Sequence, residues 1–293
     1  MTADERPAPV RASVLARRGA DRLRGQVASP EVDARLLLAH LLGLRPGDLV
    51  LADPPSAERV ARYRELLDRR AEGVPLQHLT GEAWFRNVRV AVGPGVFVPR
   101  PETESVAGAA IEAARAVRMQ GRTPRVVELC AGSGAISAAL VDEVPGCRVV
   151  AVEIDPVAVD WARRNLAGTG VDVRRGDLAD AVPEWDGTVD VVVVNPPYVP
   201  LRVRAVLPVE VTGHDPALAV FSGEDGLDAI RAVERTARRL LRPGGLLVCE
   251  HDDSQGESAP AVFSGGAWRA TADHPDLSGR PRFVSATRTQ VAG

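Results

Sequence analysis

The chain has 293 residues, enough for one large or two modest domains, and its 45% hydrophobic and 26% charged residues are ordinary for a globular protein. No apolar run approaches the ~18 residues that a membrane-spanning helix requires, which argues against an integral membrane protein. The net charge of −3 gives no reason to expect a broad nucleic-acid-binding surface.

The start of the chain and its cysteines both indicate a reducing compartment. Residues 1–9 are polar and acidic, with no apolar core behind a basic start, so we expect no secretory signal. Cys130, Cys147 and Cys249 have no metal-binding spacing and form no even set for disulfides. We therefore predict reduced thiols, no metal site and a cytoplasmic location.

The first part of the chain, from about residue 8 to 72, has the pattern of a small helical bundle. Ser29-Pro30-Glu31 is a favourable helix start, because a capping residue, a proline at the first position and an acid in the first turn follow one another. Leucines repeat at helical spacing up to Gly43, and Ser56 begins a further helix. Because this bundle has no reactive constellation, we predict that residues 1–75 form a substrate-recognition domain.

The pattern changes to strands and turns over residues 76–99. Alternating side chains from Trp84 to Val92, punctuated by glycine and proline, predict a β-hairpin that links two domains. A rigid turn and then a helix follow at Phe97–Glu104. Within it Arg100 suits either an ion pair with a nearby acid or a position at the rim of an active site.

From Arg125 strands and helices alternate, which predicts a parallel sheet in a domain spanning residues 100–293. The segment 202–225 is the longest irregular connection, and such loops are often functional. The predicted strands are 126–129, 148–152, 171–174, 189–194, 246–250 and two near the end of the chain, around 268 and 283–287. We therefore predict an α/β fold of the Rossmann-like type.

A glycine-containing turn follows the first of these strands. Gly132 and Gly134 let the backbone approach a ligand closely, and Glu153, about 20 residues further on, can accept both hydroxyls of a ribose. Asp177 suits either the amino group of an adenine or a simple turn cap. These features fit a bound NAD as well as a bound S-adenosylmethionine.

Three features favour S-adenosylmethionine over NAD. Glu128 precedes the turn, where an acid can help to hold a cationic ligand. Ser137 stands where the dinucleotide fingerprint has its third glycine. The fourth strand ends in Asn195-Pro196-Pro197-Tyr198.

This tetrapeptide suits a planar group that bears an NH2. The β-branched run at 189–194 predicts a strand buried on both faces, and two prolines must end it. The Asn195 side-chain oxygen and the Pro196 carbonyl can each accept one N–H of a substrate amide or nucleobase, and Tyr198 can stack on its plane. Such positioning needs no nucleophilic side chain, and His214 is interpreted as a loop histidine.

The chain resembles the PrmC/HemK family of methyltransferases, which modify a glutamine nitrogen in class I peptide chain release factors. The resemblance covers nearly the whole chain. The matching motifs are Gly73–Gly81, Val98–Glu104, Glu128–Gly134, Asn195–Tyr198, Ser222–Leu227 and Glu250–Gln255.

The resemblance implies a helical N-terminal domain, a hairpin linker and a class I methyltransferase domain that uses S-adenosylmethionine. Cys130 stands where many relatives have glycine, and Glu128 and Glu153 stand where many have aspartate. The donor-binding residues carried over by motif are Glu128, Cys130, Ala131, Gly132, Ser133, Gly134, Glu153, Asp177, Leu178 and Asn195. Those expected to hold the substrate are Asn195, Pro196, Pro197 and Tyr198, with Asn195, Pro196 and Tyr198 as the catalytic set.

The implied reaction is methylation of the glutamine side-chain nitrogen in the Gly-Gly-Gln motif of a release factor, with no membrane partner and no direct nucleic-acid binding. Three alternatives stay open on sequence grounds. They are an adenine N6-methyltransferase acting on nucleic acid, a small-molecule N-methyltransferase and a non-catalytic binding module. The slightly acidic balance argues against the first, because neutralising phosphates supplies most non-specific affinity for nucleic acids.

Overall fold

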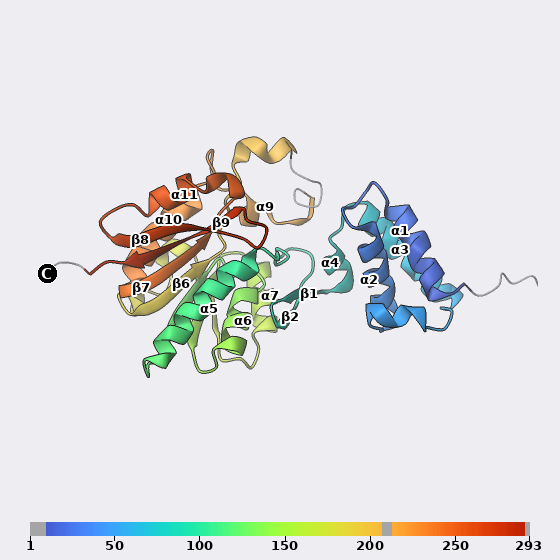
Figure 1. Ribbon diagram of the computed structural model, residues 1–293, viewed down its shortest axis with the longest axis horizontal. Helices are drawn as coiled ribbons and strands as arrows, with labels where there is room; N and C mark the ends of the chain where they lie inside the picture. Colours follow the sequence, from blue (N-terminus) through green and yellow to red (C-terminus); the bar gives the residue numbers. More distant parts are fainter. Residues whose placement is uncertain (1–9, 207–212, 291–293) are drawn as a thin grey trace, which may run out of the picture. The chain divides into compact units, whose positions relative to one another are not determined.

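A computed structural model describes residues 10–206 and 213–290 of the chain (Figure 1). The described residues form two compact units, one of the residues up to Gly81 and the other of most residues from Glu82 onward. The expected absence of a secretory signal concerns residues 1–9, which lie outside the described residues. Residues 207–212 of the long irregular connection also lie outside them.

The first unit is helical, and its helices begin and end at the local signals that the sequence contains. Pro30 is the first residue of its helix, but the side chain of Ser29, predicted as the cap, makes no capping hydrogen bond. Gly43 ends that helix in the left-handed conformation with a φ of 69°. The Ser56 hydroxyl accepts the backbone N–H of Arg59 and so caps the next helix. The elements are α1 (Ala12–Leu23), α2 (Pro30–Leu42), η1 (Pro46–Val50), α3 (Ala57–Ala71) and α4 (Leu76–Thr80).

A tyrosine holds the centre of this helical unit. Tyr63 is buried, and its hydroxyl donates to the carbonyl oxygen of Ala34 over 2.9 Å. Gly19 of α1 packs against the ring, and a Cβ at this position would overlap the Tyr63 hydroxyl. Arg70 and Asp33 form a buried ion pair beside it, with 2.7 Å between Nε and Oδ2.

A β-hairpin opens the second unit, and it begins later than predicted. Residues 76–80, predicted as part of the hairpin, form helix α4, and the strands are β1 (Glu82–Phe85) and β2 (Val88–Ala91). Asn165 fixes the hairpin to the rest of the unit. Its side chain accepts the Ala91 N–H over 2.8 Å and donates to the carbonyls of both Ala91 and Ser133 over 2.9 Å. Asn165 therefore links the hairpin to the predicted cofactor turn.

The second unit is built on a seven-stranded sheet in the order β5-β4-β3-β6-β7-β9-β8, which confirms the predicted α/β class. The first five strands in this order are parallel. At one edge β9 pairs antiparallel with β7, and β8 pairs antiparallel with β9. The strand β7 begins at Leu241, earlier than the predicted 246. The strands are β3 (Arg125–Leu129), β4 (Arg148–Glu153), β5 (Asp172–Arg175), β6 (Val189–Val194), β7 (Leu241–Glu250), β8 (Trp268–Pro275) and β9 (Pro281–Arg288).

Helices cover both faces of this sheet (Figure 1). The hairpin and the first three helices of the unit share a core with Val191 and Val193 of β6, whereas Val192 and Val194 face a second core on the other side. This alternation follows from the two-residue period of a strand. The helices are α5 (Thr103–Met119), α6 (Ala135–Glu143) and α7 (Pro156–Asn165) on the first face, and α10 (Asp228–Leu240) and α11 (Ser258–Val262) on the second.

Short elements lie in the connections, and the strand order places the site. The short elements are η2 (Leu178–Asp180), η3 (Pro183–Trp185), η4 (Leu201–Val206), α9 (Ala217–Val220) and η5 (Asp253–Gln255). The chain runs from β3 outward through β4 to β5, then returns to β6 on the other side of β3. In such sheets ligands bind at the carboxyl ends of the strands where the order reverses. This point lies between β3 and β6.

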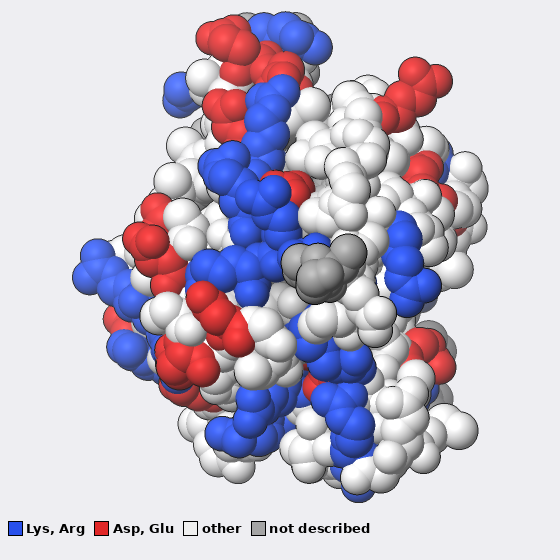
Figure 2. All heavy atoms as spheres, turned by 90° about the vertical axis from the view of Figure 1, so that its left-hand side faces the viewer, with Lys and Arg blue, Asp and Glu red and all other residues white. Residues whose placement is uncertain are grey.

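Arginines gather around a buried carboxylate near the start of the parallel strands. Asp190 accepts the Arg125 N–H over 3.0 Å and forms ion pairs with Arg122 at 2.9 Å and Arg242 at 2.5 Å. Figure 2 shows a band of basic side chains on one face of the molecule, a local feature that net charge does not reveal.

In residues 10–206 and 213–290 no helix has the length and apolarity to cross a membrane.

We predict that Gly19→Ala destabilises the helical unit, because the new methyl group would overlap the Tyr63 hydroxyl. Overpacking of this kind costs roughly 1–3 kcal/mol. Gly47→Ala is the matched control, since a Cβ there meets no atom within 4 Å. Urea unfolding of both variants, and of Gly19→Ala combined with Tyr63→Phe, measures the effect. Equal stability of the two single variants would contradict this account of the packing, and partial recovery in the double variant would support it.

Candidate functional site

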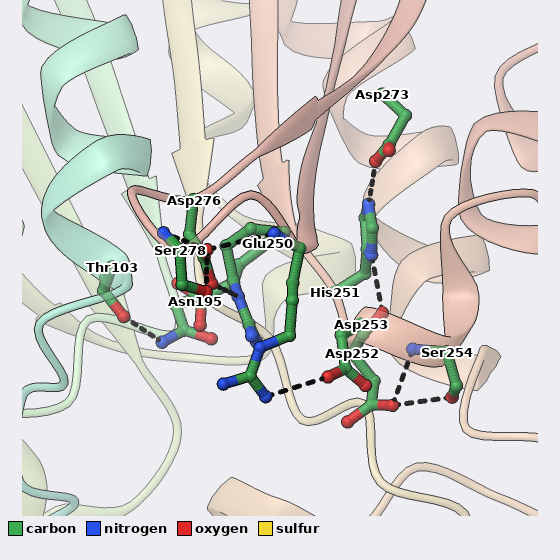
Figure 3. A network of polar contacts seen from close by, with 12 residues as sticks. Thr103, Asn195, Glu250, His251, Asp252, Asp253, Ser254, Asp273, Asp276 and Ser278 are labelled. Carbon is green, nitrogen blue, oxygen red and sulfur yellow. Dashed lines mark hydrogen bonds and ion pairs between the residues drawn. The ribbon is translucent and has the colours of Figure 1, made fainter.

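The amide of Asn195 is oriented by a threonine from a different part of the chain. Asn195 directly follows β6 and is half-buried, and its Nδ2 donates to Oγ1 of Thr103 over 3.2 Å (Figure 3). Thr103 is the first residue of α5 and is buried. Because the NH2 group is engaged there, the side-chain oxygen of Asn195 stays available as an acceptor.

A buried carboxyl group lies next to this pair. Glu250 is the last residue of β7, and its Oε1 accepts a hydrogen bond from the Tyr198 hydroxyl over 3.3 Å. Burial raises the pKa of Glu250 to about 7, and the Thr103 hydroxyl, the Arg282 guanidinium and the Tyr198 hydroxyl hold it from rising further. Within the described part of the chain, Oε2 of Glu250 is buried and has no hydrogen-bond partner.

Two further loops fix the backbone at Tyr198. The Gln255 side chain donates to the Tyr198 carbonyl over 3.1 Å and to the Asp225 carbonyl over 3.4 Å. Gly226 has a φ of 80°, and a Cβ there would overlap the Tyr198 carbonyl oxygen. The segments 222–227 and 250–255, both singled out in the sequence, therefore support the Asn195–Tyr198 segment.

The predicted cofactor turn lies between β3 and α6. Gly132 and Gly134 have φ values of 54° and 79° but differ in surroundings. A Cβ at Gly134 would lie 2.8 Å from Cδ1 of Leu166, so this glycine permits close packing of the segment after α7. A Cβ at Gly132 would meet no atom within 4 Å, which leaves room for a ligand.

The other residues of the turn have structural contacts. Cys130 has a φ of 53°, a strained conformation for a residue with a Cβ, and its side chain packs against the second core. Burial raises the pKa of its thiol. Ala131 is buried and donates its N–H to the Val152 carbonyl over 3.1 Å. Ser133 is buried and offers its carbonyl to Asn165.

Glu153 lies against the turn, as the sequence spacing predicts for an acid at the end of the second strand. Its Oε2 accepts the Gly132 N–H over 2.8 Å, and its Oε1 accepts the N–H groups of Ile154 and Asp155 over 2.8 and 2.9 Å. Each carboxylate oxygen can accept more than one hydrogen bond, so the group can still receive hydroxyl donors.

Asp177 and Leu178 lie at the end of β5. Asp177 is exposed, and its Oδ1 accepts the Ala179 N–H over 2.9 Å, which makes it the cap of η2. The turn-cap role, one of the two open from the sequence, is therefore present in the structure, and the second oxygen has no part in that cap. Leu178 is partly buried against the second core.

Glu128 makes a contact that sequence reasoning did not foresee. Its Oε2 accepts the Ser137 N–H over 2.9 Å and also the Ser137 hydroxyl, so it holds the first turn of α6. Burial is the main cause that raises the pKa of Glu128 to about 8. Ser137, noted as the residue in place of a third glycine, is thus the partner of this carboxyl.

Arg100 has a structural contact, whereas Thr103 and Glu250 are the residues near the site that the sequence did not single out individually. Arg100 pairs with buried Asp215 over 2.9 Å and lies over the Phe97 ring, so the ion-pair alternative is realised. Thr103 and Glu250 fall within segments that were singled out, but no local pattern shows that their side chains meet Asn195 and Tyr198.

Among residues 10–206 and 213–290, no group of three or more His, Cys, Asp or Glu could hold a metal ion.

Comparisons with known proteins agree with this arrangement. The PrmC N-terminal domain family matches residues 15–81, and the methyltransferase small domain family matches residues 107–206. The catalytic domain of hMettl16, solved in complex with the MAT2A 3'UTR hairpin 6, has a TM-score of 0.53 at 12% identity and covers 80% of this chain and 82% of that chain, which indicates a shared fold.

Curated relatives extend over both units. A release factor glutamine methyltransferase from Streptomyces coelicolor is 54% identical, covering 89% of this chain and 92% of the relative, and one from Mycolicibacterium smegmatis is 47% identical with the same coverage. A 4-amino-L-phenylalanine/4-methylamino-L-phenylalanine methyltransferase from Streptomyces pristinaespiralis is 45% identical, covering 88% of this chain and 86% of the relative. With the helical unit, the sheet order and the Asn195–Tyr198 segment all in place, the chain belongs to the release factor glutamine methyltransferase family.

Proposed function

We propose that this protein transfers a methyl group from S-adenosylmethionine to the side-chain amide nitrogen, N5, of the glutamine in the Gly-Gly-Gln motif of class I peptide chain release factors. The observation that carries the proposal is the orientation of Asn195. Its NH2 is engaged by Thr103, so its oxygen is free to accept an N–H from a substrate amide. The relatives at 54% and 47% identity bear the name of this activity.

The donor site is assigned to the turn after β3 and the ends of β4 and β5. Open space at Gly132 gives the donor backbone access, and the Glu153 carboxylate beside it suits two ribose hydroxyls. Asp177 offers its uncommitted oxygen to an adenine amino group. Glu128 shapes the turn through Ser137. The proposed donor set is Glu128, Cys130, Ala131, Gly132, Ser133, Gly134, Glu153, Asp177, Leu178 and Asn195.

The acceptor site is assigned to Asn195, Pro196, Pro197 and Tyr198. The Asn195 oxygen and the Pro196 carbonyl each accept one N–H of the substrate amide, and the Tyr198 ring lies against its plane. When bound, S-adenosylmethionine supplies a sulfonium methyl group. The amide nitrogen forms the new N–C bond, the S–C bond breaks with its electron pair going to sulfur, and one N–H proton leaves to solvent. Orientation and electrostatics provide the catalysis.

The helical unit is assigned to recognition of the protein substrate. We place recognition in residues 1–75, the linker in 76–99 and the chemistry in 100–293. The basis is that the described helices of this unit, residues 12–80, contain no reactive constellation. Release factors as partners imply a cytoplasmic location, with neither a membrane nor a nucleic acid as a direct partner.

A second candidate function is methylation of a small aromatic amine. The Streptomyces pristinaespiralis relative, named for 4-amino-L-phenylalanine, is 45% identical over both units. An aromatic NH2 would fit the same two acceptors, so the acceptor pair does not separate the two substrates. An adenine amino group would fit them equally well.

Incubation with release factor and donor, followed by peptide mass spectrometry, should detect one added methyl group on the glutamine of Gly-Gly-Gln. A release factor with glutamate in place of that glutamine should receive none, because the N–H donors are gone. Parallel reactions with 4-amino-L-phenylalanine and with DNA and RNA are the comparison. Faster transfer to any of these, or to another residue of the release factor, would overturn the proposal.

Glu153→Ala should weaken donor binding, because two charge-assisted hydrogen bonds to the ribose are lost, each worth roughly 1.5–3 kcal/mol. A loss of about 1.4 kcal/mol already corresponds to tenfold in affinity, so calorimetric titration should detect it easily. Glu184→Ala is the control, since Glu184 pairs with Arg174 on the surface. Unchanged affinity of Glu153→Ala would remove this residue from the donor site.

Asn195→Ala should lower kcat far more than donor affinity, because it removes an acceptor for the substrate amide while the other residues of the proposed donor set remain in place. Loss of one positioning contact can cost on the order of a hundredfold in rate. Single-turnover kinetics with release factor, together with donor titration of the same variant, separates the two effects. Wild-type turnover in this variant would refute the proposed acceptor site.

A further inference from the structure

The carboxyl group of Glu250 has no part in the transfer described above, yet it contacts the residues that hold the acceptor. Its Oε1 accepts the Tyr198 hydroxyl over 3.3 Å, and the Thr103 hydroxyl also interacts with the group. The residue is 1% exposed, and within the described residues its Oε2 is buried without a hydrogen-bond partner. Figure 3 draws Glu250 together with Asn195 and Thr103.

The ionisation state of Glu250 decides which way the hydroxyl protons point. An ionised carboxylate only accepts hydrogen bonds, so Thr103 and Tyr198 must both donate to it. A Thr103 hydroxyl that donates its proton can offer only lone pairs to Asn195. The amide must then turn its NH2 toward Thr103, as observed, and its oxygen away.

A protonated Glu250 removes this constraint. Its O–H can donate to Thr103, and the Thr103 proton is then free to point toward the amide of Asn195. The amide can turn over and present its NH2 group to the substrate. Two NH2 groups facing each other cannot form a hydrogen bond, so this orientation does not hold a glutamine side chain.

We propose that Glu250 is a positioning residue for methyl transfer, whose carboxylate fixes the orientation of the Asn195 amide through Thr103 and anchors the Tyr198 hydroxyl. This inference rests on the proposed acceptor site and adds a residue that does not itself touch the substrate. We call the chain of contacts from Glu250 through Thr103 to Asn195 the relay. It connects three elements, because Glu250 ends β7, Thr103 begins α5 and Asn195 follows β6.

The charges around Glu250 place its titration in the physiological range. Burial raises its pKa to about 7, and Glu102 before α5 adds to that rise, whereas Arg282 of β9 opposes it. Asp276 pairs with Arg282 over 3.3 Å and limits that effect. Glu250 should therefore be ionised above about pH 7, where it fixes the Asn195 amide, and protonated below it. We expect kcat to rise with pH through this range.

The test compares the pH dependence of kcat in Glu250→Gln and in wild type with release factor as substrate. Glu250→Gln keeps the shape of the side chain and cannot ionise. At about pH 8 its kcat should fall roughly tenfold to a hundredfold, the range expected when a reacting group is misplaced by about 1 Å. The rise through neutral pH should disappear, while the donor Kd stays unchanged.

Three further variants separate positioning from loss of fold. Thr103→Val should reproduce the loss, Thr103→Ser should retain activity because it keeps the hydroxyl, and Thr103→Val with Glu250→Gln should be no worse than either single change. Glu143→Gln is the matched control. It removes a shielded carboxylate at the end of α6 that pairs with Arg86 and Arg115, and it should keep the wild-type pH profile.

A readout that needs no turnover completes the test. The side-chain NH2 resonances of Asn195 should shift with a midpoint near the titration of Glu250 in wild type and not in Glu250→Gln. If wild type methylates release factor but Glu250→Gln keeps the same kcat, pH profile and resonance shifts, the role of Glu250 is refuted. If wild type does not methylate release factor, the proposed function fails, and the resonance shifts alone decide whether the relay exists.

Discussion

The burial of β6 on both faces is the constraint on which the site depends. Its six residues are all buried, with successive valines packed into opposite cores. A shift of one residue in register would exchange the two valine sets, so the pairing with β3 and β7 is strongly specified. Pro196 then ends the strand abruptly. Asn195 is therefore held at a fixed position, beside the ends of the neighbouring strands β3 and β7.

Buried carboxyl groups near that point have a shared physical character. Glu128 and Glu250 are both about 1% exposed, and burial raises the pKa of each. Each is partly compensated by a hydroxyl from another element, Ser137 for Glu128 and Tyr198 for Glu250. Burying a carboxyl group that has no cationic partner in direct contact lowers the stability of the fold. Acids buried in this way are typical of functional sites.

The proposed acceptor pair would recognise an NH2 group and little else. An oxygen from Asn195 and a carbonyl from Pro196 can serve an amide, an aromatic amine or an adenine. Selection between them must then come from surfaces outside the pair, since a few hydrogen bonds to a shared group cannot discriminate between molecules that all possess it. The helical unit, which packs around Tyr63 with its own core, is the surface to which we assign this selection.

Local sequence signals determined much of the architecture. The valine run at 189–194, Pro30 at a helix start, the cap at Ser56 and the glycines of the turn after β3 act within a few residues, so they can be recognised without the fold. The same approach was wrong for 76–80, where a short helix forms before the hairpin. Only the tertiary structure decided that Thr103 meets Asn195, 92 residues away, and that Glu250 meets Tyr198, 52 residues away. Those contacts depend on the order of the strands in the sheet. Strand order cannot be read from the local sequence around the residues that it brings together.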